Sequence, residues 1–157
     1  MKLLFENWRG YIREIYSPRE SVTIATRKEL KKYLEQNPEE NFTINIDNPV
    51  DSYKKFGTGT PHRLPFDYGE WPELINPADD MGWDLIIVPS ASGGSHPAQN
   101  LKIIGVVEYD GEKAPNKEGN DKMIVAPGRN ILDSDKKIIK DFFEKLSDFK
   151  KVKWSTK

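Results

Sequence analysis

The stretch from residue 42 to residue 127 is divided into short apolar runs by Pro, Gly and polar residues, and this pattern limits the fold more than any other feature. One run alternates between apolar and polar residues, as in a half-buried strand, and three are continuously apolar, as in buried strands. Strands are therefore predicted at 42–46, 85–88, 103–107 and 123–125. The stretch 48–77, rich in Pro, Gly and aromatic residues, indicates further short strands and loops.

A helix is predicted before the strands. Thr26 begins it, because Glu29 three residues later completes a capping box, and Asn37-Pro38 ends it. We expect residues 1–40 to form a helical extension that packs on the strands, or else a contact between copies of the chain in a homo-oligomer. Residues 41–157 then form the main domain.

A second helix is predicted after the strands, over residues 134–147, with Asp133 or Ser134 as its cap. Its apolar residues follow a helical spacing along one side: Ile138, Ile139, Phe142, Phe143 and Leu146. The order helix, many short strands, helix predicts a mainly β (α+β) fold. The expected architecture is a small closed OB-like β-barrel with flanking helices.

Composition limits the function classes. The 157 residues are 36% hydrophobic and 31% charged, which predicts one soluble globular domain. The formal net charge of −1 argues against nucleic-acid binding driven by bulk charge. No apolar run approaches the roughly 20 residues that span a bilayer, and the N-terminus has too little apolar sequence for a signal peptide. We therefore expect a cytoplasmic protein with no membrane partner.

Metal-binding chemistry is limited by the absence of cysteine. Any metal must be held by oxygen ligands or by the two histidines, His62 and His96, and oxygen ligands favour Mg²⁺, Mn²⁺ or Ca²⁺. We expect His62 to be a loop residue rather than a catalyst. For His96, no acidic partner is evident that would orient it.

The acidic segment 79–84, directly before the predicted strand 85–88, is the strongest chemical signal. Carboxylates at the mouth of a buried strand lose hydration, which is unfavourable unless they bind something. A pair of divalent cations would offset their mutual repulsion. On spacing alone, a solvated acidic turn remains the alternative.

The surroundings of this segment resemble the family I soluble inorganic pyrophosphatases over about residues 42–157. Before it, Leu64-Pro65-Phe66-Asp67-Tyr68-Gly69 resembles the family's Tyr-Pro-x-Asn/Asp-Tyr-Gly segment. The acidic segment itself resembles the family's Asp-Gly-Asp-Pro-x-Asp. The later matches follow in the family's order: Gly105-Val106-Val107 with Asp110, residues 120–127, residues 142–144 and residues 151–154.

The resemblance implies a Mg²⁺-dependent inorganic diphosphatase, with Mn²⁺ as a second metal, that hydrolyses pyrophosphate to two phosphates. The implied catalytic residues are Tyr68, Asp79, Asp84 and Lys122. The implied metal ligands are Asp79, Asp84 and Asp110, with Asp80 or Asp121 near enough to contribute. The implied phosphate-binding residues are Lys54, Arg63, Tyr68 and Lys122. Family enzymes use a metal-bound hydroxide for in-line attack while cations neutralise the leaving phosphate.

Several positions depart from the family's pattern. Met81 stands in place of the middle Asp of the acidic motif, and a thioether is a poor ligand for Mg²⁺. The other departures are Asn45, Phe56, Leu64, Asn120, Leu146 and Ser147. They predict reduced activity and leave a second hypothesis open: a catalytically inactive member of the fold that binds a phosphate-bearing ligand or a protein. In the first case, Met81→Asp is expected to raise activity.

Overall fold

The computed structural model describes residues 21–37, 44–56, 59–77, 81–93, 101–109, 121–128 and 131–155. In chain order, the elements are β1 (Val22–Thr23), α2 (Arg27–Gln36), β2 (Asn45–Asn48), β3 (Tyr53–Lys54), β4 (His62–Arg63), β5 (Tyr68–Asn76), β6 (Met81–Ile87), the short 3-10 helix η1 (Pro89–Ala91), β7 (Leu101–Tyr109), β8 (Lys122–Pro127), α3 (Asp133–Glu144) and β9 (Phe149–Trp154). The predicted mainly β fold with two helices is confirmed for these residues.

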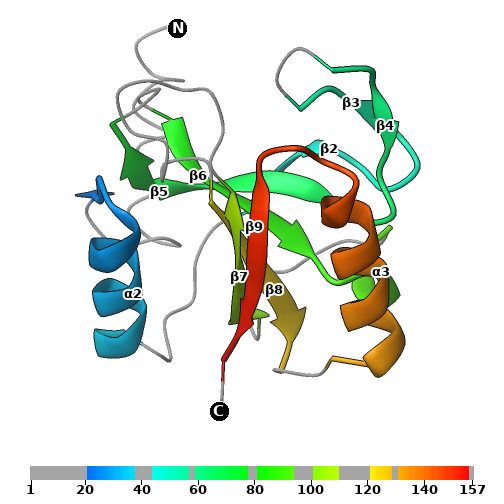
Figure 1. Ribbon diagram of the computed structural model, residues 1–157. Coiled ribbons are helices and arrows are strands. Elements are labelled where there is room, and N and C mark those ends of the chain that lie inside the picture. The colour runs from blue at the N-terminus through cyan, green and yellow to red at the C-terminus, as the bar shows by residue number, and fades with distance from the viewer. Residues whose placement is uncertain are drawn as a thin grey trace, which may run out of the picture.

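One mixed sheet of seven strands forms the centre of the molecule (Figure 1). Its order is β1-β5-β6-β8-β7-β9, and β2 also pairs with β5. The β1–β5 and β6–β8 pairs are parallel and the others are antiparallel, while β3 and β4 form a separate hairpin-like pair. Among the described residues this hydrogen-bonded path does not return to its first strand, so the closed barrel of the sequence prediction is not confirmed.

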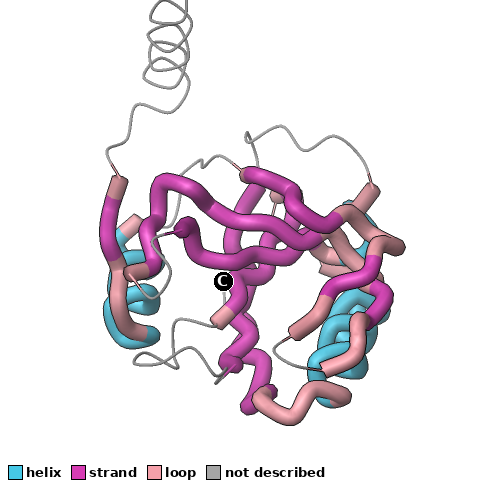
Figure 2. The backbone as a smooth tube through the Cα atoms, turned by 90° about the horizontal axis from the view of Figure 1, so that it is seen from above, coloured by secondary structure: helices cyan, strands magenta, loops and turns pink. Residues whose placement is uncertain are grey.

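The two helices lie on opposite sides of the sheet (Figures 1 and 2). Because side chains alternate along a strand, β6 contributes to both sides. Trp83 and Leu85 share a buried cluster with Leu30 of α2, whereas Ile86 shares a second cluster with Phe143 of α3. We call these two sides the α2 face and the α3 face. Polar side chains of neighbouring strands can contact each other only if they lie on the same face of the sheet.

The beginning of α2 agrees with the sequence prediction. The Thr26 hydroxyl accepts a hydrogen bond from the backbone N–H of Glu29 at 3.1 Å, and the Glu29 carboxylate accepts one from the N–H of Ala25 at 3.0 Å. The helix ends at Gln36, and Asn37 caps it by donating its backbone N–H to Tyr33. Thr26 is therefore confirmed as the N-cap, but the capping box is not complete, because the Glu29 carboxylate accepts from Ala25, one residue before the cap, and not from Thr26 itself.

The predicted cap of α3 is wrong. Leu132 is the N-cap, and Asp133 and Ser134 already belong to the helix. The capping carboxylate comes from Asp135, which is buried and accepts hydrogen bonds from the N–H of Leu132 and from both the N–H and hydroxyl of Ser90. The start of α3 is thus tied to η1. Ile138, predicted to face the core, is 38% exposed.

Two residues of the motif at 64–69, Asp67 and Gly69, hold neighbouring segments of the backbone together. Asp67 is buried, and its carboxylate accepts hydrogen bonds from the N–H groups of Val50 at 2.8 Å and Gly93 at 2.9 Å. Gly69 pairs with Ile46 of β2, and a Cβ on Gly69 would lie 1.9 Å from the carbonyl oxygen of Asn45. Only glycine allows β2 to approach β5 this closely. The motif therefore holds the strand that carries Tyr68.

Candidate functional site

Four of the predicted site residues meet on the α3 face: Lys54, Tyr68, Asp84 and Lys122. The pairing of the strands explains why. In the antiparallel β5–β6 pair Asp84 lies opposite Glu70, so Tyr68, two residues earlier, is its diagonal neighbour on the same face. In the parallel β6–β8 pair, Leu85 lies beside Met123, which brings Lys122 next to Asp84. Residues from three neighbouring strands thus converge on one carboxylate.

The carboxylate of Asp84 is shared by two donors. The Tyr68 hydroxyl donates to Asp84 Oδ2 at 2.8 Å, and the ammonium of Lys122 donates to the same oxygen at 3.0 Å. The side chain of Lys122 is only 4% exposed, whereas that of Asp84 is 29% exposed. Because little water reaches the ammonium of Lys122, water competes weakly with Asp84 for this charge-assisted hydrogen bond. Asp84 therefore holds Lys122 at the edge of the site.

Aromatic rings surround the two lysines. Lys54 Nζ lies 4.6 Å from the centre of the Tyr68 ring, and Lys122 Nζ lies 5.1 Å from that of Tyr109. Ammonium groups at these distances are attracted to the ring faces. The result is two cations, one phenol and one carboxylate in a small volume, an arrangement suited to binding an anion with several oxygen atoms.

Tyr68 is held in its protonated form. Burial raises the pKa of the Tyr68 phenol well above its ordinary value, and the charge of Asp84 and its hydrogen bond to the phenol raise it further. Tyr68 can thus donate a hydrogen bond but does not supply a negative charge at neutral pH. The charge of Asp47, on β2, acts on Tyr68 in the same direction.

Asp47 was missed at the level of sequence. The resemblance aligns a carboxylate of the family with Asn45 of the same strand. The sequence could have indicated Asp47, because it is a carboxylate only two residues further on. The pairing of β2 with β5 shifts between Ile46 and Asn48, an irregularity that leaves Asp47 without a direct partner across the pair. Such a bulge cannot be read from apolar alternation.

Phe56 closes one side of the site with an apolar ring. Its ring centre lies 5.8 Å from that of Tyr68, 5.7 Å from that of Phe142 and 6.2 Å from that of Phe143. The resemblance has a Glu at this position. Here the position belongs to an aromatic cluster that joins the site to α3, and Leu146, just after the end of α3, is buried in the same cluster. This side of the site therefore supplies packing rather than charge.

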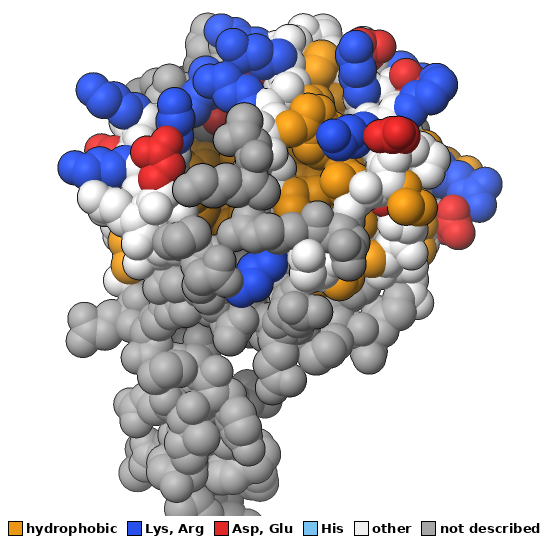
Figure 3. Space-filling model, turned by 90° about the horizontal axis from the view of Figure 1, so that it is seen from below, with side chains coloured by type: hydrophobic (Ala, Val, Ile, Leu, Met, Phe, Trp, Pro, Cys, Tyr) orange, Lys and Arg blue, Asp and Glu red, His pale blue; other side chains and the backbone are white. Residues whose placement is uncertain are grey.

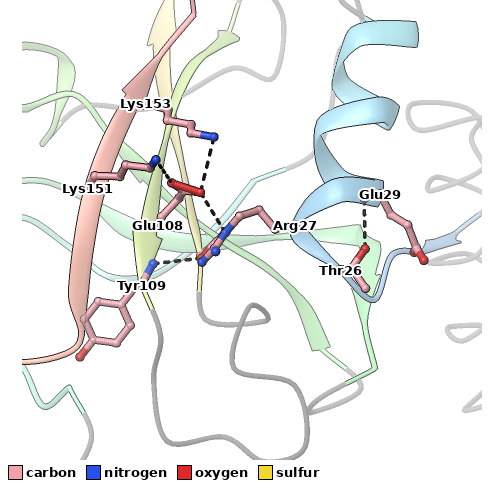
Figure 4. A network of polar contacts seen from close by, with 8 residues as sticks. Thr26, Arg27, Glu29, Glu108, Tyr109, Lys151 and Lys153 are labelled. Carbon is pink, nitrogen blue, oxygen red and sulfur yellow. Dashed lines mark hydrogen bonds and ion pairs between the residues drawn. The ribbon is translucent and has the colours of Figure 1, made fainter.

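Asp121 lies on the other face of the sheet. Its carboxylate accepts hydrogen bonds from Arg27 of α2 at 2.6 and 2.8 Å and from the N–H of Tyr109 at 3.0 Å. Glu108 lies beside it, 3.2 Å from Arg27 and 3.7 Å from both Lys151 and Lys153 (Figure 4). The structure thus does not bring Asp121 together with Asp84. It gives Asp121 a role in joining α2 to the sheet.

The pKa of Asp121 is raised because the carboxyl group is buried, although the hydrogen bonds from Arg27 and from the N–H of Tyr109 partly offset this. Removing a carboxylate from water disfavours its charged form, and only a close cation makes that form acceptable. The network on the α2 face therefore depends on Arg27.

Arg63 is not brought to the site. In the β3–β4 pair, Lys54 lies opposite His62 and Tyr53 lies opposite Arg63, so Arg63 and Lys54 project from opposite sides of the pair. Arg63 forms an exposed ion pair with Asp51 at 3.0 Å.

Met81 is the first residue of β6 and is 53% exposed. By strand alternation it lies on the α2 face with Trp83, on the side away from Asp84. The remaining predicted ligands, Asp79, Asp80 and Asp110, lie outside the described residues.

The described residues contain no group of three or more Asp, Glu or His side chains that could hold a metal ion. Asp84 has the oxygen chemistry that Mg²⁺ prefers, but one of its oxygens already accepts from Lys122 and Tyr68. The type of donor, a carboxylate oxygen, thus fits Mg²⁺. The described residues alone, however, offer too few such donors to hold the ion. The described helices also include none that is long and apolar enough to cross a membrane.

No model of a known protein family and no curated protein matches the sequence. Among solved structures, the inorganic pyrophosphatase from Ehrlichia chaffeensis has a TM-score of 0.44 and 15% identity, covering 74% of this chain and 84% of that one. The inorganic pyrophosphatase from Helicobacter pylori has a TM-score of 0.44 and 14% identity, covering 75% and 79%. That from Neisseria gonorrhoeae has a TM-score of 0.42 and 17% identity, covering 72% and 79%. TM-scores and identities this low carry no conclusion about activity.

Proposed function

We propose that this chain is a divalent-metal-dependent phosphoanhydride hydrolase that acts on inorganic pyrophosphate with reduced turnover. The observation that supports this most is the meeting of Lys54, Tyr68, Asp84 and Lys122 on one face. They come from four different strands, and the resemblance to family I pyrophosphatases selects the same four positions.

In this proposal Lys54 and Lys122 bind phosphate oxygens, and the protonated Tyr68 turns its single O–H, which donates to Asp84 in the structure, to the same anion. Asp84 orients Lys122 and offers an oxygen to Mg²⁺ or Mn²⁺, with further oxygens from Asp79, Asp80 or Asp110. The metal, when bound, lowers the pKa of a water molecule and offsets the charge of the phosphates. A phosphate that enters competes with Asp84 for the ammonium of Lys122, which would free the carboxylate.

The test is the release of phosphate from pyrophosphate with and without Mg²⁺ or Mn²⁺. We expect slow, metal-dependent release that Lys122→Ala lowers by about a hundredfold, the cost of removing one preorganised donor. Lys28→Ala, an exposed lysine on α2, is the matched control and should change nothing.

A second candidate function is favoured by Phe56. It puts a packed aromatic ring where the family has a carboxylate, which suits binding of a phosphate-bearing ligand without hydrolysis. If a folded wild type binds pyrophosphate in a calorimetric titration but releases no phosphate with either metal, the hydrolase proposal is wrong and this candidate takes its place.

A further inference from the structure

A groove of about 590 Å³ lies between α3 and β9, which stand side by side in Figure 1. None of its lining residues belongs to the group formed by Lys54, Tyr68, Asp84 and Lys122. Its volume falls within the range of about 300–1,000 Å³ that is typical of sites for small molecules. The groove is therefore a separate feature of the molecule, and its chemistry is independent of the proposed function.

The walls of the groove are rich in lysine. Five lysines line it from both sides: Lys136, Lys137, Lys140, Lys150 and Lys151. The two carboxylates that also line it, Asp141 and Glu144, are each paired with a lysine one turn earlier on α3. Lys151 also lies 3.7 Å from Glu108, so three of the five lysines have an acidic partner. The five lysines still outnumber the two carboxylates of the groove, and because the whole chain has a net charge of −1, this excess of cations is local. Such a concentration of positive charge attracts anions.

The groove also contains two partly buried aromatic residues, Phe149 and Trp154. Lys136 Nζ lies 5.3 Å from the centre of the Trp154 ring, so a cation and an aromatic surface meet at one point. On the lower face of the molecule, Lys and Arg side chains border a strip of hydrophobic ones (Figure 3). A phosphate ion alone would gain nothing from an aromatic surface, whereas a ligand with both phosphates and a planar ring would use both features.

We propose that this groove binds a free nucleoside polyphosphate, with its phosphates on Lys136 and Lys150 and its base against Trp154. Bases stack on aromatic side chains whatever their identity, and Lys136 and Lys150 line the same groove from its helix wall and its strand wall. A single strand of nucleic acid fits less well, because the groove is bounded by one helix of 12 residues and one strand of 6.

The test is calorimetric titration without divalent metal, which keeps phosphoanhydride hydrolysis from interfering. The ligands are adenosine triphosphate, inorganic tripolyphosphate and a short single-stranded oligonucleotide. Adenosine triphosphate should bind best, and Lys136→Ala or Lys150→Ala should each weaken it about tenfold, as expected for one charge-assisted contact. Lys145→Ala, an exposed lysine of the same segment outside the groove, is the control and should leave affinity unchanged.

Several results would overturn the proposal. Equal affinity for tripolyphosphate would show that no base is recognised, and tighter binding of the oligonucleotide would point to a strand-binding surface. Loss of binding in Lys122→Ala, with no change in Lys136→Ala, would place the nucleotide at the Asp84 site. The absence of binding to wild type would exclude the groove as a nucleotide site, whatever the outcome of the pyrophosphate assay.

Discussion

Asp121 and Lys122 are neighbours in the sequence, but their side chains lie on opposite faces of the sheet. Lys122 donates to Asp84 on the α3 face, and Asp121 accepts from Arg27 on the α2 face. Strand geometry makes this separation unavoidable once Lys122 enters β8. One short segment thus serves both the candidate site and the attachment of α2, so a change at Arg27 acts close to Lys122.

Arg27→Ala should lower the free energy of unfolding by about 3 kcal/mol, the lower end for breaking a buried ion pair, because Arg27 itself is 22% exposed. The substitution leaves the buried Asp121 carboxylate beside Glu108 without its main cation. Since burial already raises the pKa of Asp121, the variant should recover part of the lost stability as the pH falls and Asp121 takes up a proton.

Urea unfolding at neutral and mildly acidic pH would measure both effects. Arg63→Ala, which removes the exposed partner of Asp51, is the matched control and should change stability little. Equal losses in the two variants would mean that the Arg27–Asp121 contact does not hold α2 on the sheet.

Tyr68→Phe should reduce the loss of stability at alkaline pH. Burial, together with the charge and hydrogen bond of Asp84, keeps the pKa of Tyr68 well above its ordinary value of 10.0. As the pH rises above that value, the unfolded chain releases this proton and the folded chain keeps it, so stability falls. The variant should lack this component, although it should be about 2 kcal/mol less stable at neutral pH because it loses a hydrogen bond to a charged group.

Denaturation midpoints across the alkaline range would test this, with Tyr53→Phe as a control at a side chain that is 66% exposed. A slope for Tyr68→Phe that matches the wild type would show that Tyr68 ionises as readily in the folded protein as in the unfolded chain.

Local signals in the sequence predicted the parts of the fold that depend on local interactions. The hydrogen bond from the Glu29 N–H to the Thr26 cap requires only residues three apart, and the continuous apolar run at 85–88 reflects burial on both faces of β6. The nine-residue strand β5 was not predicted, because Pro72 and two glutamates interrupt its apolar pattern. Its partners on both sides, β2 and β6, are what make it a strand.

In the candidate site, too, contacts between residues far apart in the sequence could not be predicted from local patterns. The resemblance selected Lys54, Tyr68, Asp84 and Lys122 one by one, and the strand pairing explains how they can meet. The partners of Asp121 could not be predicted, since Arg27 lies 94 residues away in the chain. Asp135, which replaces the expected caps of α3, was likewise hidden because its second partner, Ser90, belongs to a distant turn.

Met81→Asp should have little effect on phosphate release, in contrast to the increase that the sequence alone suggests. Met81 is exposed and lies on the α2 face of β6, so a carboxylate at this position would not join Asp84 on the other side. Parallel assays of wild type and variant with Mg²⁺ would decide. A clear gain in the variant would mean that β6 changes its register when metal binds, and that the family's alignment describes the active state better.

Asp84→Asn should separate binding from hydrolysis. The substitution removes the negative charge closest to Lys122 while keeping an oxygen that can accept from Tyr68, so pyrophosphate should bind about tenfold more tightly in the absence of metal. The reason is electrostatic: unit charges 4 Å apart interact by about 4 kcal/mol at the effective dielectric constant near a protein surface, and pyrophosphate no longer competes with Asp84 for the lysine. Release of phosphate with Mg²⁺ should nevertheless fall, because an amide is a poorer metal ligand than a carboxylate.

Calorimetry and the release assay would be run on the same preparations, with Glu35→Gln on the exposed side of α2 as the control. Weaker pyrophosphate binding would show that Lys122 does not contact the ligand, and undiminished release would remove Asp84 from the proposed machinery.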